Sequence, residues 1–226
     1  MTPTLNAGEP DVWIPVRGAR LGGELHLPGG ATGLVVFAHG SGSSRLSPRN
    51  QQVARSLQNA GLGTLLFDLL TESESETRAN VFDLDLLADR LLAATEWLSL
   101  RPDTASLQLG YFGASTGAGA ALIAAARAGE RVHAVVSRGG RPDLAGDWLS
   151  RVRAPTLLIV GSLDTVVIRL NRLALRHLQC PARIVEVPGA THLFEELGTL
   201  AQVSRLACDW FLDYLGPEGG RSVGRA

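Results

Sequence analysis

The sequence has few cysteines, and neither is placed as a ligand or a redox pair. Its 226 residues include only two, Cys180 and Cys208, and neither stands in a CxxC motif or a mixed Cys/His cluster. This spacing gives no sign of a disulfide framework or of a zinc site. We expect both thiols to be buried structural residues.

Charge of one sign is also lacking. The 21 Lys and Arg residues nearly balance the 22 Asp and Glu residues, and the formal net charge is −1. The basic residues are dispersed rather than massed in a run, so the chain has no electrostatic basis for binding nucleic acid. A small-molecule partner is the expectation, and nothing indicates an oligomeric state.

Long apolar runs are absent as well. No segment reaches the roughly 18 apolar residues that a transmembrane helix needs, and the opening residues "MTPTLNAGEPDVW" lack the features of a signal peptide. We therefore expect a soluble, cytoplasmic protein that does not enter a membrane.

The chain is long enough for one sizeable domain, which we predict over residues 1–216. Residues 217–226 are predicted to form a flexible tail, and "TESESET" at 71–77 a solvated loop.

Between these segments, short apolar runs alternate with helical patterns. An early hairpin at 12–16 and 21–27 is followed by apolar runs at 34–38, 63–68, 107–112, 132–137, 155–160 and 182–187. Runs without polar alternation are typical of strands buried on both faces. Helical spacing follows at 47–61, 81–100, 116–129, 144–152, 167–178 and 197–215. The pattern predicts an α/β fold whose mostly parallel sheet carries helices on both faces.

A serine follows the strand at 107–112 directly. Ser115 lies between Gly113 and Gly117 in "GASTG" and opens the next helix, the context that a nucleophile elbow requires. The glycines would avoid collisions with the adjacent strand and helix. Ser222 in "GRSVG" fits the same short pattern but has neither element beside it. A glycine-rich helix start that only packs tightly is the alternative interpretation of the Ser115 stretch.

A serine nucleophile needs a base and an acid that orients the base, and in this type of fold the two follow the serine in the order acid, histidine. We favour His192, in the loop after the strand at 182–187, over His177, which lies in a helical run. Asp164, just after the strand at 155–160, is the favoured acid. The other candidates are Asp143 and Asp147 in the preceding loop and short helix, and Asp68, which comes before the serine.

An oxyanion also needs backbone donors. The amide of Thr116 would point from a helix N-terminus, and the amide of Ser41, after His39 and Gly40, could aim at the same point. His39 itself is expected to brace its loop.

Three stretches now carry a likeness: "HGSGSSRLSPRN", "YFGASTGAGAAL" and "SRGGRPDLA". Over nearly its whole length the sequence resembles the α/β-hydrolase superfamily. Within it, the chain is similar to small dienelactone-hydrolase-like members, including those fused to a phosphoribosyltransferase domain. The resemblance implies Ser115 as nucleophile, Asp164 as acid and His192 as base, with the Ser41 and Thr116 amides as oxyanion donors. Characterised dienelactone hydrolases use cysteine where this chain has Ser115, so their dienelactone substrate does not carry over.

The segment after the strand at 132–137 has room only for a loop and one short helix, so we expect a minimal cap or none and an open, shallow site. Arg138 and Arg141 lie in this segment and Arg45 follows "GSGSS". Each could bind a substrate carboxylate or simply brace its loop.

The combined prediction is a serine hydrolase of small, soluble carboxylic esters that needs no metal or organic cofactor. The alternatives are a thioesterase or acyltransferase acting on carrier-bound acyl groups, and a ligand-binding protein without catalysis.

Overall fold

The computed structural model describes residues 11–216. Its strands are β1 (Val12–Val16), β2 (Ala19–His26), β3 (Gly33–Ala38), β4 (Gly63–Phe67), β5 (Gln108–Ala114), β6 (Val132–Arg138), β7 (Thr156–Gly161) and β8 (Ala182–Val187). They form an eight-stranded sheet in the order β1-β2-β4-β3-β5-β6-β7-β8. From β4 to β8 all pairs are parallel, whereas β1 and β2 add an antiparallel edge. The sheet is therefore mostly parallel, as the sequence predicts.

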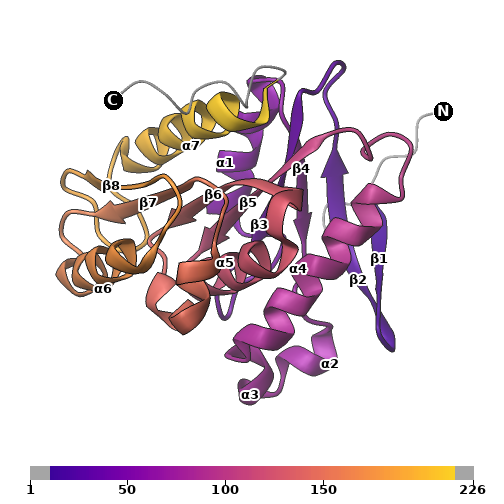
Figure 1. The fold of residues 1–226 in the computed structure, drawn as a ribbon, viewed down its shortest axis with the longest axis horizontal. Coiled ribbons are helices and arrows are strands. Elements are labelled where there is room, and N and C mark those ends of the chain that lie inside the picture. The colour runs from indigo at the N-terminus through magenta and orange to yellow at the C-terminus, as the bar shows by residue number, and fades with distance from the viewer. Residues whose placement is uncertain (1–10, 217–226) are drawn as a thin grey trace.

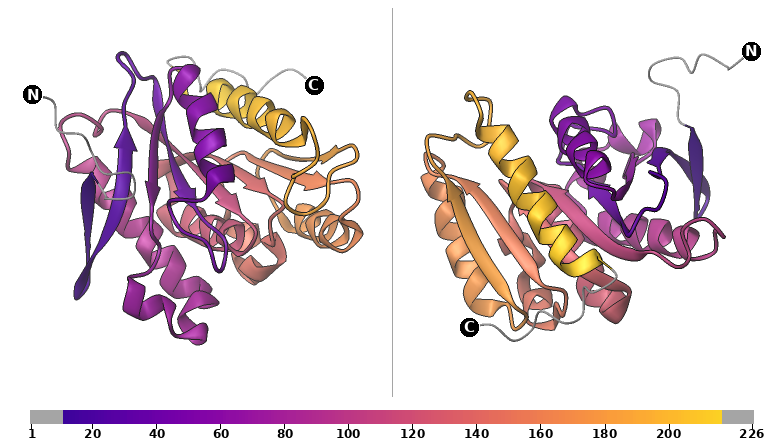
Figure 2. Two further views of the ribbon diagram at one scale, coloured as in Figure 1. Left: turned by 180° about the vertical axis from the view of Figure 1, so that it is seen from behind. Right: turned by 90° about the horizontal axis from the view of Figure 1, so that it is seen from above.

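Helices cover both faces of the sheet. They are α1 (Pro48–Asn59), α2 (Glu72–Ser75), α3 (Arg78–Val81), α4 (Leu84–Ser99), α5 (Thr116–Ala128), α6 (Thr165–His177) and α7 (Thr199–Leu215), with the 3₁₀ segments η1 (Gly129–Arg131) and η2 (Pro142–Arg151). Helices α1 and α7 lie on one face and α4, α5 and α6 on the other (Figure 1). Seen from behind, α1 and α7 lie side by side across the sheet (Figure 2).

The apolar runs of the strands are buried because successive side chains enter two different cores. Val36 and Tyr111 pack into the core beneath α4 and α5, whereas Val35 and Phe112 pack into the core beneath α1 and α7. A strand buried on both faces has no position for a polar residue, which is why these runs show no alternation. This is the α/β-hydrolase fold that the resemblance implies.

Two local predictions were wrong. Residues 71–77 are not simply a solvated loop, because α2 forms there with a capping box: the Thr71 hydroxyl accepts from the Glu74 amide, and the Glu74 carboxylate accepts from the Thr71 amide. The expected helix at 144–152 is instead part of the 3₁₀ segment η2, which bends at Gly146 with φ of 51°. Only glycine adopts such an angle without strain.

The predicted tail at 217–226, with Ser222, lies outside the described residues, and the domain prediction for 1–216 extends beyond them at its start. Among the residues that the structure describes, no helix is both long enough and apolar enough to span a membrane.

Candidate active site

Ser115 lies in the sharp turn between β5 and α5. Its φ of 50° and ψ of −122° put a non-glycine residue in a strained region of backbone space. Two backbone bonds hold the turn: the Ser115 amide donates to the Arg138 carbonyl at 3.3 Å, and the Ser115 carbonyl accepts from the Arg141 amide at 3.0 Å. The loop after β6 therefore holds the turn that presents the serine.

The two glycines flanking Ser115 are required for close approach. A Cβ atom on Gly113 would lie 2.4 Å from the Ala118 Cα, and one on Gly117 would lie 2.3 Å from the Ala38 carbonyl oxygen. Neither backbone neighbour can move far, so any side chain at these positions would push α5 or β3 away. This is the collision that the sequence pattern predicts.

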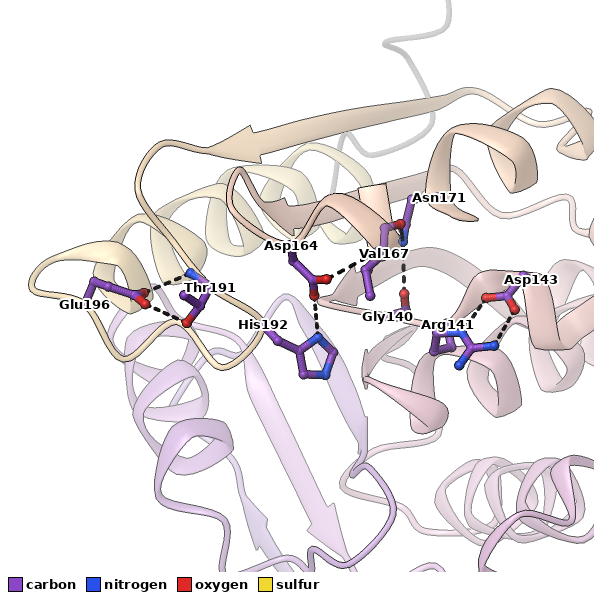
Figure 3. A network of polar contacts seen from close by, with 9 residues as sticks. All are labelled: Gly140, Arg141, Asp143, Asp164, Val167, Asn171, Thr191, His192 and Glu196. Atoms are coloured by element: carbon purple, nitrogen blue, oxygen red, sulfur yellow. Dashed lines mark hydrogen bonds and ion pairs between the residues drawn. The ribbon is translucent and has the colours of Figure 1, made fainter. Parts of the chain in front are cut away.

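Asp164 and His192 are joined directly. His192 Nδ1 lies 2.7 Å from Asp164 Oδ2, while Oδ1 of the same carboxylate accepts from the Val167 amide at 3.3 Å and caps α6 (Figure 3). Because the carboxylate is the acceptor, Nδ1 carries the proton and Nε2 is left to act as a base. The side chain of His192 is 39% exposed, so this side of the site is open to solvent.

The loop that carries His192 is fixed at several points. Glu196 accepts two bonds from Thr191, from its amide at 3.1 Å and from its hydroxyl at 2.5 Å (Figure 3). Phe194 adopts φ of 56° and is buried in the core beneath α1 and α7. A Cβ on Gly139 would lie 3.7 Å from His192 Cε1, so the imidazole stands beside the end of β6. The sequence analysis missed Thr191, Phe194 and Glu196 because their roles depend on contacts across the loop.

The Ser41 amide has a different acceptor from the one expected. It donates to the Thr116 hydroxyl at 2.8 Å rather than standing free beside the Thr116 amide. Threonine at position 116 provides this acceptor because its buried side chain turns toward the loop after β3. The expected convergence of the two amides therefore needs the Ser41 amide to leave the hydroxyl for a substrate oxygen.

His39 braces its loop, as predicted. The Leu69 amide donates to Nε2 at 3.0 Å, so the proton of the neutral ring is on Nδ1, which donates to the Gly40 carbonyl at 3.0 Å. Burial lowers the pKa of His39 and keeps the ring neutral. His39 thus ties the loop after β3 to the loop after β4.

Comparisons with known proteins place this arrangement in a family. Residues 28–209 match the dienelactone hydrolase family. The chain belongs to the dienelactone hydrolase family.

Three known proteins illustrate what this chain is similar to. A crystal structure of a dienelactone hydrolase from Anabaena variabilis superposes with a TM-score of 0.89 at 58% identity, covering 92% of this chain and 98% of that one. Est1E from Butyrivibrio proteoclasticus shares the fold, with a TM-score of 0.76 at 16% identity over 89% of this chain and 97% of its own. A Mycobacterium tuberculosis H37Rv protein named "Putative phosphoribosyl transferase" is 62% identical over 87% of this chain, and the match spans only 45% of that longer protein. Family membership supports hydrolase activity.

Two of the three candidate arginines form ion pairs with nearby carboxylates in this member of the dienelactone hydrolase family. Arg141 pairs with Asp143 through two bonds of 2.8 and 2.7 Å, and Arg45 forms an ion pair with Asp68 (Figure 3 shows the first pair). The carboxylates of Asp143 and Asp68 therefore already have arginine partners, and Asp147 is exposed on η2. These carboxylates do not compete with Asp164 for His192.

Arg138, the third candidate, differs from both. It is only 8% exposed, and its Nε and Nη1 atoms have no hydrogen-bond partner among the described residues. Burial, together with a smaller repulsion from the positive charge of Arg49, lowers the pKa of Arg138 to about 10. The guanidinium therefore stays charged at neutral pH. A buried charge without a hydrogen-bond partner is unfavourable unless another group satisfies it. The backbone carbonyl of Arg138 accepts from the Ser115 amide, so the end of β6 lies beside the Ser115 turn.

A cavity of about 410 Å³ adjoins the Ser41 loop. It is lined by the loop after β3 (39–44), the loop after β4 (68–72), and Ser75, Val81 and Leu87. We call residues 71–83 the wall segment. The site is therefore open to solvent beside His192, and beside Ser41 it adjoins a partly open cavity that the expectation of a shallow site did not include.

The remaining candidates lie away from this chemistry. His177 is exposed at the end of α6. Cys180 and Cys208 are half-buried rather than fully buried, and burial raises the pKa of both thiols, to about 11 for Cys208. Within residues 11–216, no cluster of three or more His, Cys, Asp or Glu side chains could hold a metal ion.

Proposed function

We propose that this protein is a serine hydrolase of carboxylic esters. The observation that carries the proposal is the Asp164–His192 bond of 2.7 Å at the edge of the sheet where the strained Ser115 also lies. A hydroxyl becomes a good nucleophile only when an oriented base takes its proton, and these three residues supply hydroxyl, base and orienting acid.

The reaction would run through an acyl-enzyme. His192 Nε2 takes the proton of the Ser115 hydroxyl as its oxygen attacks the ester carbonyl. The tetrahedral oxyanion accepts from the Thr116 amide and from the Ser41 amide, which releases the Thr116 hydroxyl. The C–O bond to the alcohol breaks, and His192 gives that oxygen its proton. Water, deprotonated by His192, then attacks the acyl-enzyme, and the acid leaves as Ser115 regains its proton.

Arg138 supports a more specific substrate. We propose that it binds an anionic group of the ester, because its buried Nε and Nη1 have no hydrogen-bond partner among the described residues and its backbone carbonyl accepts from the Ser115 amide. Arg45 and Arg141 brace their loops in this scheme, since each already has a carboxylate partner. A carboxylate binds a guanidinium side-on through Nε and Nη2 or end-on through Nη1 and Nη2, so either geometry would satisfy one of the two unpaired nitrogens of Arg138.

Two other functions use the same fold. A thioesterase or acyltransferase would share the acyl-enzyme and differ only in the group that leaves or accepts. A ligand-binding protein without catalysis would need no bond between Asp164 and His192. Parallel assays of an oxygen ester and a thioester of one acyl group separate the first alternative.

Labelling with a fluorophosphonate tests the proposal first, since it reports an activated serine without knowledge of the substrate. We expect the native protein and the Ser222→Ala variant to be labelled and to hydrolyse p-nitrophenyl acetate. The Ser115→Ala variant should do neither. Labelling that persists in Ser115→Ala, or a native protein that neither labels nor hydrolyses the ester, would rule the proposal out.

A further inference from the structure

The cavity beside Ser41 has a place in the reaction that the family likeness does not assign. Resting on the proposed function, we propose that this cavity binds the acyl group of the ester and selects acyl groups that are uncharged and largely apolar. The argument starts from where the cavity lies relative to His192.

The order of strands separates the two. Ser115 follows β5, which lies between β3 and β6 in the sheet. The cavity is built by the loops after β3 and β4, whereas the His192 imidazole stands beside Gly139 at the end of β6. A carbonyl carbon at Ser115 therefore has the cavity on one side and His192 on the other.

The proton transfer decides which part of the ester faces which side. The departing alcohol oxygen must lie within hydrogen-bond reach of His192, because that residue gives it a proton. The alcohol therefore extends toward β6, where Arg138 is also placed. The acyl group, the other substituent of the carbonyl, is then directed toward β3 and β4 and into the cavity.

The lining of the cavity excludes anions. Among the residues that the structure describes, no lysine or arginine lines it, and His39 in its lining is held neutral by burial. Glu72 also lines the cavity, and Asp68 is paired with Arg45. An acyl group with its own carboxylate would meet the Glu72 carboxylate and no unpaired cation among the lining residues, which disfavours it.

The remaining lining favours an apolar group. Leu69 and Leu87 belong to the core, and Leu70 and Val81 add further apolar surface. A cavity of about 150 Å³ holds one benzene ring, so 410 Å³ has room for an aromatic or branched acyl group. Ser41, Ser43 and Thr71 also line the cavity, and their hydroxyls could bind an uncharged oxygen of such a group.

The wall segment is built firmly enough to select by size. Besides the capping box, the Glu74 carboxylate accepts from Arg90 at 2.5 Å, and its carbonyl accepts from the Asn80 side chain at 3.0 Å. Arg90 is buried on α4, so the wall is anchored to a core helix. A firm wall limits the acyl group that fits, in contrast to a mobile loop.

A series of p-nitrophenyl esters with a constant alcohol tests the proposal. We expect kcat/KM to rise at least tenfold from acetate to butyrate or benzoate, and the hemisuccinate to fall at least tenfold below butyrate. Hydrolysis of the acetate that depends on Ser115 is measured first. If it is absent, the proposed function fails; if it is present and acyl size and charge have no effect, only the acyl pocket fails.

Two matched variants locate the effect. Ser75 lines the cavity and Ser73, on the same short helix, does not, although both are exposed. We expect Ser75→Phe to lower kcat/KM at least tenfold more for the benzoate than for the acetate, and Ser73→Phe to change neither. Equal effects of the two variants on benzoate hydrolysis would overturn the assignment. So would a loss in Ser75→Phe that, in a second series of esters with one acyl group, depends on the size of the alcohol.

Discussion

The two sides of Ser115 are built in different ways. On the β6 to β8 side, Arg138 ends β6, and short loops hold Asp164 and His192 by backbone bonds and one carboxylate–imidazole bond. On the β3 and β4 side, two loops and the wall segment line a cavity of about 410 Å³. The first side carries the groups that move protons, and the second offers a space whose shape can vary without disturbing them.

This difference separates chemistry from selection. Residues in tight turns at strand ends have few alternatives, since each glycine or strained angle is required by a nearby backbone. The wall segment is anchored instead by side chains, through the ion pair of Glu74 with Arg90 on α4. Changes on the first side should therefore affect every substrate, and changes on the second side only some.

The largest expected effect comes from the acid. Asp164→Asn keeps the shape but loses the acceptor that fixes the His192 tautomer, so kcat should fall by roughly 10³- to 10⁴-fold for every ester tested. Asp147→Asn, an exposed carboxylate on η2, should leave kcat within twofold. A loss of less than tenfold in Asp164→Asn would show that another group orients His192.

The next effect belongs to Arg138 and depends on the substrate. Arg138→Met keeps much of the length but removes the charge, so kcat/KM should fall by about 10- to 100-fold for an ester with an anionic alcohol. A neutral ester of the same acid should change by less than threefold. Arg141→Met is the matched control, because its guanidinium is already paired with Asp143. Equal losses for both esters in Arg138→Met would mean that Arg138 only supports the Ser115 turn.

The β6 to β8 side of Ser115 could be predicted well from the sequence. The strands, the Ser115 turn and the Asp164–His192 pairing could be inferred because each depends on local patterns: continuous apolar runs, glycines beside a serine, and polar residues just after strands. Close packing of backbone on backbone leaves a visible mark in the sequence, since only glycine fits there.

The β3 and β4 side, with its wall segment, could not be predicted in the same way. "TESESET" has the composition of a loop, and its helix depends on the reciprocal Thr71–Glu74 bonds and on Arg90 from a distant helix. The three arginines looked equivalent in the sequence. Only the structure shows that Arg45 and Arg141 have carboxylate partners, whereas Arg138 is buried and has none within residues 11–216. The Ser41–Thr116 bond joins residues 75 positions apart, beyond any local pattern.

A smaller effect is expected where the two loops of the cavity side are tied together. Because burial lowers the pKa of His39 in the folded protein, the unfolded chain takes up a proton below pH 6.5 that the folded protein does not. Stability should therefore fall as pH decreases from 6.5, by at most about 1.4 kcal/mol per pH unit for this one proton. Urea unfolding at several pH values measures it.

Two variants isolate this contribution. His39→Gln should lose part of the pH dependence, while His177→Gln, at an exposed position on α6, should keep all of it. Burial also lowers the pKa of His133, but that contribution is common to all three proteins. Identical pH dependence in the native protein and His39→Gln would show that His39 accepts a proton in the folded state without penalty.

The smallest expected effect concerns the bond that joins the two sides of Ser115. The Thr116 hydroxyl accepts from the Ser41 amide at 2.8 Å, and the proposed mechanism transfers this amide to the oxyanion. Thr116→Val keeps the branched shape and removes the competing acceptor, so the amide remains available to the carbonyl and kcat/KM should stay within threefold of native. Thr116→Ser, which keeps the hydroxyl, is the control. A tenfold or larger loss in Thr116→Val, with Thr116→Ser unaffected, would show instead that the hydroxyl itself donates to the oxyanion, because only then does its removal take away a bond that forms in the transition state.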